Sequence, residues 1–202
     1  MAKLYFRYGT MDSAKSLNLL AVAHNYRQQG KRVALLKPKL DDRFGAEVIA
    51  SRSGLSKPVD LLLESDTELD PPFFAELDCV LVDEAQFLSP KVIDQLRALT
   101  RSHDLPVICY GLRTDFRTRL FPGAARLFEV ADKIEEVKVT CQNCTRKAVF
   151  NMRLVDGAPT FEGPQVLLGA NDTYVPVCYH CYEAALPGAL MGAHGESRRA
   201  PN

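Results

Sequence analysis

The sequence predicts an α/β fold, in which a parallel sheet carries helices on both faces and a small β-rich module follows. Three short apolar runs each end in glycine or in acidic residues, and stretches of helical periodicity separate them. Two Cys-x-x-Cys pairs then appear in the C-terminal third, among short alternating runs and Gly/Pro turns. With 202 residues, 47% of them hydrophobic, the chain can bury a substantial core without disulfides.

The elements alternate along the chain as β-α-β units require. The expected strands are Leu4–Tyr8, Val33–Leu36, Cys79–Val82 and Val107–Gly111. A helix should begin at Lys15 and end near Gly30, with its apolar positions at Leu17, Leu20, Ala21 and His24, and a second should include Val92–Leu99. The polar stretch from Asp41 to Ser56 predicts a long loop near the site. In such sheets, ligands bind at the carboxyl ends of the strands.

The character of the sequence changes after Val139, which suggests three parts. Residues 1–138 are expected to form the nucleotide-binding α/β domain, and residues 139–186 a zinc-ribbon-like module. The tail, residues 187–202, contains Gly, Ala and Arg without periodicity and is expected to be disordered.

Charge and composition argue against several classes of function. Twenty-five basic and twenty-five acidic residues cancel, so the chain lacks the positive field that attracts nucleic acid or an anionic membrane. The N-terminus is too polar for a signal peptide and no run is long enough to span a bilayer, so a cytoplasmic location is expected. In that reducing compartment, paired cysteines indicate metal binding rather than disulfides.

Residues Gly9–Ser16 carry a variant of the Walker A pattern between a predicted strand and a predicted helix, the context of a P-loop NTPase. Backbone N–H groups would wrap the phosphates, Lys15 would reach the β- and γ-phosphates, and the Ser16 hydroxyl would bind Mg²⁺. Two residues depart from the usual loop. Ala14 stands where glycine is usual, and Asp12 places a carboxylate near a polyanion. The alternative is an ordinary strand-turn-helix with a surface lysine.

The apolar strand Cys79–Val82 delivers two carboxylates, Asp83 and Glu84, to its carboxyl end, as a Walker B motif does. Asp83 would hold Mg²⁺, and Glu84 would accept a proton from an attacking hydroxyl. Alone, the pair could instead be solvated helix-cap residues, which is the less favoured alternative.

Four cysteines, Cys141, Cys144, Cys178 and Cys181, form two pairs with thirty-three residues between them. Four thiolates close a tetrahedral Zn²⁺ site with no open position, so the predicted zinc is structural. A redox dithiol is the rival interpretation. His180 is expected to be a bystander, and Cys79 and Cys109 to be buried core residues.

These residues together resemble the thymidine kinases of the zinc-containing type, which are related to the human cytosolic enzyme, and in particular the bacterial members. The resemblance runs from Leu4 to about Leu186. It rests on Tyr8–Met11 with Lys15-Ser16, Asp41–Gly45, Val82–Leu88, Cys109–Arg117 and Gly169–Tyr174 leading into Cys178.

The resemblance implies transfer of the γ-phosphoryl group of ATP to the 5′-hydroxyl of thymidine or deoxyuridine, with Glu84 as the catalytic base and Mg²⁺ as cofactor. It assigns phosphate or ATP binding to Gly9, Thr10, Met11, Asp12, Ser13, Ala14, Lys15, Ser16, Asp83, Glu84 and Gln86. It assigns the nucleoside pocket to Met11, Asp41, Arg43, Phe87, Leu112, Phe116, Phe121 and Tyr174. For the aromatic residues the alternative is core packing.

The resemblance also implies a lasso-like loop between the cysteine pairs that closes over the nucleoside, so that zinc anchors a substrate lid. Homotetramers and feedback inhibition by dTTP are further expectations of the family. Two other functions stay open on the sequence alone. Asp12 and Ala14 are compatible with a non-catalytic nucleotide sensor descended from this kinase. An ATPase acting on a protein or nucleic acid through its zinc ribbon is the third possibility.

Overall fold

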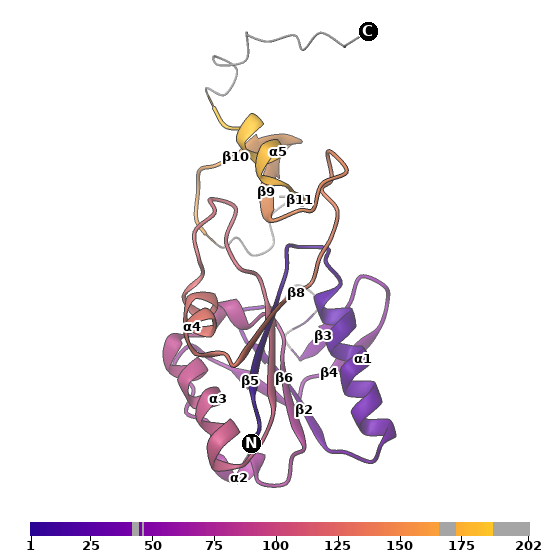
Figure 1. The fold of residues 1–202 in the computed structure, drawn as a ribbon, viewed down its shortest axis with the longest axis vertical. Coiled ribbons are helices and arrows are strands. Elements are labelled where there is room, and N and C mark those ends of the chain that lie inside the picture. The colour runs from indigo at the N-terminus through magenta and orange to yellow at the C-terminus, as the bar shows by residue number, and fades with distance from the viewer. Residues whose placement is uncertain (42–44, 46, 166–172, 188–202) are drawn as a thin grey trace, which may run out of the picture.

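The core of the computed structural model is one six-stranded sheet, and residues 1–41, 45, 47–165 and 173–187 are described (Figure 1). All neighbouring strands in it are parallel. Their spatial order is β5 (Leu61–Leu63), β2 (Val33–Pro38), β6 (Cys79–Val82), β7 (Val107–Gly111), β1 (Leu4–Tyr8) and β8 (Lys133–Glu136). The predicted parallel sheet is therefore confirmed, with two more strands than the sequence indicated. Within these ranges no helix has the length and apolar character needed to cross a membrane.

Helices cover both faces of this sheet, as predicted (Figure 1). One face packs against α1 (Lys15–Gln28), and the other against α3 (Pro90–Ser102) and α4 (Pro122–Val130). Alternation along β2 shows the division, because Val33 and Leu35 join the cluster of α1 whereas Ala34 and Leu36 join that of α3 and α4. The short helices α2 (Pro71–Phe74) and η1 (Ala85–Phe87) complete this part.

The buried face of α1 is not the one that the sequence predicted. The prediction placed it at Leu17, Leu20, Ala21 and His24. The structure instead buries Lys15, Leu19, Leu20 and Ala23, and leaves Ala21 and His24 exposed. The reason is the position of Lys15 at the first turn. Once its side chain points inward, the residues four and eight positions later share its face.

The segment predicted as a long loop, Asp41 to Ser56, contains regular structure, which corrects that expectation. Strands β3 (Val48–Ala50) and β4 (Ser56–Pro58) form an antiparallel hairpin. Ile49 is buried in the cluster of α1, and the Nζ of buried Lys37 donates to the carbonyl oxygen of Val48 at 3.1 Å. Strands of three residues are too short to show an alternating pattern, so no sequence signal indicates them.

A second, antiparallel sheet forms the C-terminal module. It has the order β10 (Ala158–Thr160), β9 (Phe150–Val155) and β11 (Thr173–Val177), and α5 (Tyr179–Ala184) follows. Met152, Val177 and Tyr182 form its core with the cysteines, and the Tyr182 hydroxyl donates to the Phe116 carbonyl oxygen at 2.7 Å. This arrangement fits the predicted β module. Its boundary at residue 139 stays a prediction, and the tail from residue 188 lies outside the described residues.

Gly123 allows α4 to approach η1 closely. A Cβ at this position would lie 2.5 Å from the Ala85 carbonyl oxygen, 2.6 Å from that of Leu88 and 2.9 Å from that of Gln86. We expect Gly123→Ala to lower the free energy of unfolding by about 1–3 kcal/mol, although alanine favours helices. Chemical denaturation measures the change. A more stable variant would contradict the close packing of α4 on η1.

Candidate active site

The loop from Gly9 to Ser16 connects β1 to α1 and curls around the Lys15 ammonium group. Lys15 Nζ donates to the Thr10 carbonyl oxygen at 2.6 Å and lies 3.3 Å from the Ser13 hydroxyl. Ala14 is the N-cap residue of α1, and its methyl side chain offers no acceptor to the first N–H groups of the helix. Backbone donors and a buried lysine at a helix N-terminus form a phosphate-binding arrangement.

Ala14 and Asp12 both hold left-handed backbone conformations, with φ of 60° and 61°. This conformation brings Cβ close to the following carbonyl oxygen and costs about 1–2 kcal/mol for an L-residue, but glycine adopts it freely. The unusual alanine therefore sits in a conformation that favours glycine. The loop keeps this left-handed conformation at Ala14 although it strains the backbone there.

We expect Ala14→Gly to stabilise the protein by about 0.5–1 kcal/mol, because the relief of strain exceeds the added entropy of the unfolded chain. The midpoint of thermal unfolding should rise by roughly 1–4 °C. Ala21→Gly is the matched control, since Ala21 is exposed within α1 and its replacement should destabilise by about 1 kcal/mol. If both variants lose stability alike, Ala14 is not strained.

Ser16 and Asp83 meet although 67 residues separate them. The Ser16 hydroxyl donates to Asp83 Oδ2 at 2.7 Å, and Asp83 is buried at the end of β6. Burial and the neighbouring Glu84 raise the pKa of Asp83 to about 7, against the opposing effects of Ser16 and Lys15. A hydroxyl and a carboxylate side by side, next to the lysine, are a donor set that fits Mg²⁺ bound with a nucleotide.

Glu84 is held by a chain of hydrogen bonds through Gln86. Gln86 Nε2 donates to Glu84 Oε2 at 2.5 Å, and Gln86 Oε1 accepts the Leu112 backbone N–H at 2.9 Å. Gly111, the last residue of β7, makes room for this amide, because a Cβ there would lie 2.5 Å from Gln86 Oε1. Glu84 itself has a φ of 49°. The structure thus orients the proposed base, and the assignment of Gln86 to ATP binding stays a prediction.

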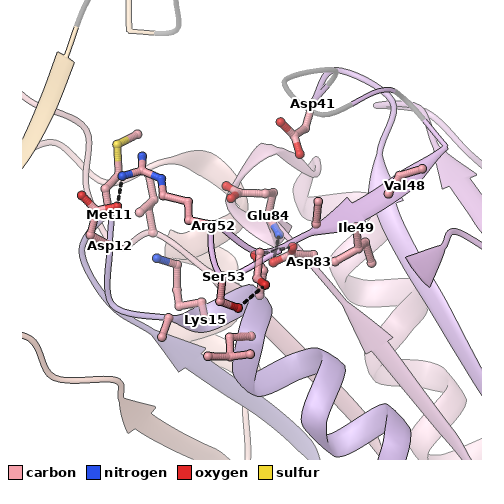
Figure 2. Close-up of a pocket in the computed structure, with 16 residues that line it drawn as sticks. Met11, Asp12, Lys15, Asp41, Val48, Ile49, Arg52, Ser53, Asp83 and Glu84 are labelled. Carbon is pink, nitrogen blue, oxygen red and sulfur yellow. Dashed lines mark hydrogen bonds and ion pairs between the residues drawn. The ribbon is translucent and has the colours of Figure 1, made fainter. Parts of the chain in front are cut away.

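A cavity of about 430 Å³ joins these groups (Figure 2). Three of the residues predicted to contact the nucleoside, Met11, Asp41 and Leu112, line it together with the phosphate loop and the two carboxylates. The hairpin turn also lines the cavity, with Ser51, Arg52 and Ser53, which the sequence did not single out. They follow a strand too short to be recognised.

The predicted aromatic residues form two pairs outside the lining of this cavity. Phe87 and Phe121 meet edge to face, with ring centroids 5.5 Å apart, and Phe116 and Tyr174 do so at 6.5 Å. Phe116 and Phe121 are buried, which fits the core-packing alternative, while Phe87 is partly buried against the same cluster as Met11. Their role at the nucleoside stays a prediction. Arg43 lies outside the described residues.

The four cysteines predicted to bind metal come together at one point. Their Sγ atoms all lie within 4.8 Å of one another, and those of Cys144 and Cys178 are 3.6 Å apart. Tetrahedral Zn–S bonds require about 3.8 Å between sulfur atoms, so the cluster fits zinc. Burial opposes ionisation of Cys141, but backbone hydrogen bonds and neighbouring thiols lower its pKa to about 6. His180, by contrast, is not part of the cluster.

Asn151 connects the module that contains the four cysteines to the phosphate loop. This buried residue lies on β9, and its Oδ1 accepts the backbone N–H of Met11 at 2.7 Å, 140 residues away in the sequence. Its β11 partner, Pro176, is two positions before Cys178. No sequence pattern indicates this contact, because a single asparagine in a short strand has no distinguishing spacing.

Comparisons with known proteins agree on one family. A family model described as thymidine kinase matches residues 2–182. A thymidine kinase of Lactococcus lactis is 44% identical over 90% of this chain and 97% of its own length. Those of Streptococcus pyogenes and Streptococcus gordonii are 41% and 40% identical over 90% of this chain, and 97% and 96% of theirs.

Similarity to solved structures is much weaker. A Pif1 helicase from Candida albicans aligns with 67% of this chain and 36% of its own, at 11% identity and a TM-score of 0.41. That likeness is too low to bear on the function.

Proposed function

The chain belongs to the thymidine kinase family, and we propose that it transfers the γ-phosphoryl group of ATP to the 5′-hydroxyl of thymidine, and also of deoxyuridine. The product would be the nucleoside monophosphate, formed in the salvage of DNA precursors. The observation that carries the proposal is the cavity that the phosphate loop lines together with Asp83 and Glu84. The loop that would bind the phosphates, the carboxylate that would bind Mg²⁺ and the carboxylate that would act as base therefore share one space.

The nucleotide side of the reaction is assigned to the loop and to β6. The backbone N–H groups from Asp12 to Ser16 and the Lys15 ammonium would hold the triphosphate, whereas those of Gly9 and Met11 already donate to Gly111 and Asn151. Ser16 and Asp83 would hold Mg²⁺, which neutralises charge on the β- and γ-phosphates. Since phosphoryl transfer depends mainly on positioning and electrostatics, these residues supply most of what the reaction needs.

The acceptor side is assigned to Glu84 and the neighbouring apolar residues. Glu84 would take the proton of the 5′-hydroxyl as oxygen attacks phosphorus, and Gln86 keeps its carboxylate oriented. Met11 and Leu112 offer apolar contacts to a neutral pyrimidine, and Asp41 lies on the same cavity. The predicted partners Arg43, Phe87, Phe116, Phe121 and Tyr174 belong to the proposal on the resemblance alone.

We assign structural zinc to the four cysteines, because four thiolates leave no open position for catalysis. The metal would anchor the segment between the cysteine pairs as a lid over the nucleoside. Feedback inhibition by dTTP, assembly into homotetramers and a cytoplasmic location complete the proposal. Inhibition kinetics with dTTP and sedimentation velocity would test the first two.

Chromatography of a reaction with MgATP and a panel of deoxynucleosides tests the function. We expect equimolar thymidine monophosphate and ADP, some product from deoxyuridine and none from purine nucleosides. A zinc-loaded, folded protein that binds ATP but phosphorylates no nucleoside would contradict the proposal.

A further inference from the structure

Arg52 lines the same cavity as the phosphate loop. It belongs to the turn between β3 and β4, and its guanidinium forms an ion pair with Asp12 (Figure 2). Asp12 is a residue of the phosphate loop itself. A cation from a separate element is thereby brought to the place where the triphosphate would enter.

The turn that carries Arg52 is well ordered by its own hydrogen bonds. The Ser51 backbone N–H donates to the Leu55 carbonyl oxygen at 2.8 Å, and Gly54, with a φ of 89°, donates to the Ser51 carbonyl oxygen at 3.0 Å. Below it, Ile49 is buried against α1. The backbone of the turn is therefore held in place, while the long side chain of Arg52 has several rotatable bonds.

Charge and exposure indicate that the ion pair is readily exchanged. The side chains of Arg52 and Asp12 are 67% and 33% exposed, and pairs of this kind contribute at most about 1 kcal/mol. A guanidinium binds phosphate through two parallel hydrogen bonds, which are roughly twice as strong as neutral ones. A triphosphate in the loop would therefore compete with Asp12 for Arg52. The unfavourable carboxylate of Asp12 would then serve to hold the arginine near the site.

We propose that Arg52 is a nucleotide-binding residue, which leaves Asp12 and binds the triphosphate directly when ATP enters the loop. The inference rests on the proposed function, but it concerns only the binding of the nucleotide. In this scheme Asp12 compensates the charge of Arg52 before ATP binds, and the triphosphate compensates it afterwards. The hairpin turn thereby becomes a second element of the phosphate site, besides the loop that carries Lys15.

Isothermal titration calorimetry with MgATP and no nucleoside tests this inference. Calorimetry measures binding without turnover, so the two proposals can fail separately. Arg52 could prove irrelevant to ATP binding in a protein that phosphorylates thymidine, and Arg52 could bind ATP in a protein that does not. We expect Arg52→Ala to weaken ATP binding about 10- to 100-fold, the range of a lost hydrogen-bonded charge contact. Arg52→Lys should keep part of the affinity, since it retains the charge without the two-pronged geometry.

The decisive arm repeats Arg52→Ala in an Asp12→Asn background. If Arg52 binds the triphosphate, the same 10- to 100-fold loss persists there. If Arg52 only neutralises Asp12, the loss disappears once the carboxylate is gone, and the proposal is overturned. Unchanged affinity in both backgrounds overturns it too. Arg32→Ala is the matched control: Arg32 is also exposed and paired, with Glu76, and it lines a different cavity, so ATP affinity should not change.

Discussion

Replacing Glu84 by glutamine is expected to lower kcat by roughly 10²–10⁴-fold, the range of a lost general base. The amide has the shape of the carboxylate and can still accept the hydrogen bond from Gln86 Nε2, so the local structure should persist. It cannot take the proton of the 5′-hydroxyl. Steady-state kinetics and ATP affinity by calorimetry, measured on the same preparation, separate chemistry from binding.

Glu129→Gln is the matched control for this variant. Glu129 lies on α4, and its exposed side chain pairs with Arg126, so both kcat and ATP affinity should remain unchanged. A Glu84→Gln protein that loses ATP affinity as much as turnover would show that Glu84 supports the loop instead of acting as the base.

Loss of the metal from the four-cysteine cluster is expected to abolish thymidine phosphorylation. The cysteines form much of the small core around Met152 and Val177, so the free energy of metal binding contributes directly to the folding of this module. Met11 would also lose the hydrogen bond from its N–H to Asn151 as β9 loosens. Chelation or Cys141→Ser should therefore reduce bound zinc, lower the midpoint of unfolding and weaken ATP binding.

Cys79→Ala distinguishes the metal ligands from the other thiols. Cys79 is buried in β6, where burial raises its pKa to about 12, so it stays a neutral packing residue. This variant should keep one equivalent of zinc and near-native activity. Full activity in a zinc-free protein would refute the role of the metal as anchor, whereas recovery on adding zinc to chelated enzyme would support it.

The local motifs were predictable because their residues are close together in sequence. A strand, a glycine-containing loop and a helix place Lys15 and Ser16 at a strand end, and the apolar run Cys79–Val82 does the same for Asp83. Two Cys-x-x-Cys pairs also predict one shared metal site, because the residue type and the spacing within each pair are typical of such sites. The sheet, its helices on both faces and the cysteine cluster follow from such signals.

The contacts that complete the site were not predictable from the sequence. Arg52 reaches Asp12 only because a hairpin of two three-residue strands rests on α1. Asn151 reaches Met11 through the docking of one module on another. The buried face of α1 was assigned wrongly because periodicity gave no weight to a lysine, although the loop turns Lys15 inward. In each case the contact or the buried face depends on tertiary packing, which the local sequence pattern does not specify.

The destination of the γ-phosphate tests the central claim most directly. ATP labelled at that phosphate should be incubated with the protein, Mg²⁺ and thymidine, with 5′-deoxythymidine as a control that lacks the acceptor oxygen. We predict that the label moves to the 5′-position of thymidine, and that the control nucleoside receives none. Label released as inorganic phosphate at the same rate with either nucleoside, or with none, would contradict a kinase built around Lys15, Asp83 and Glu84.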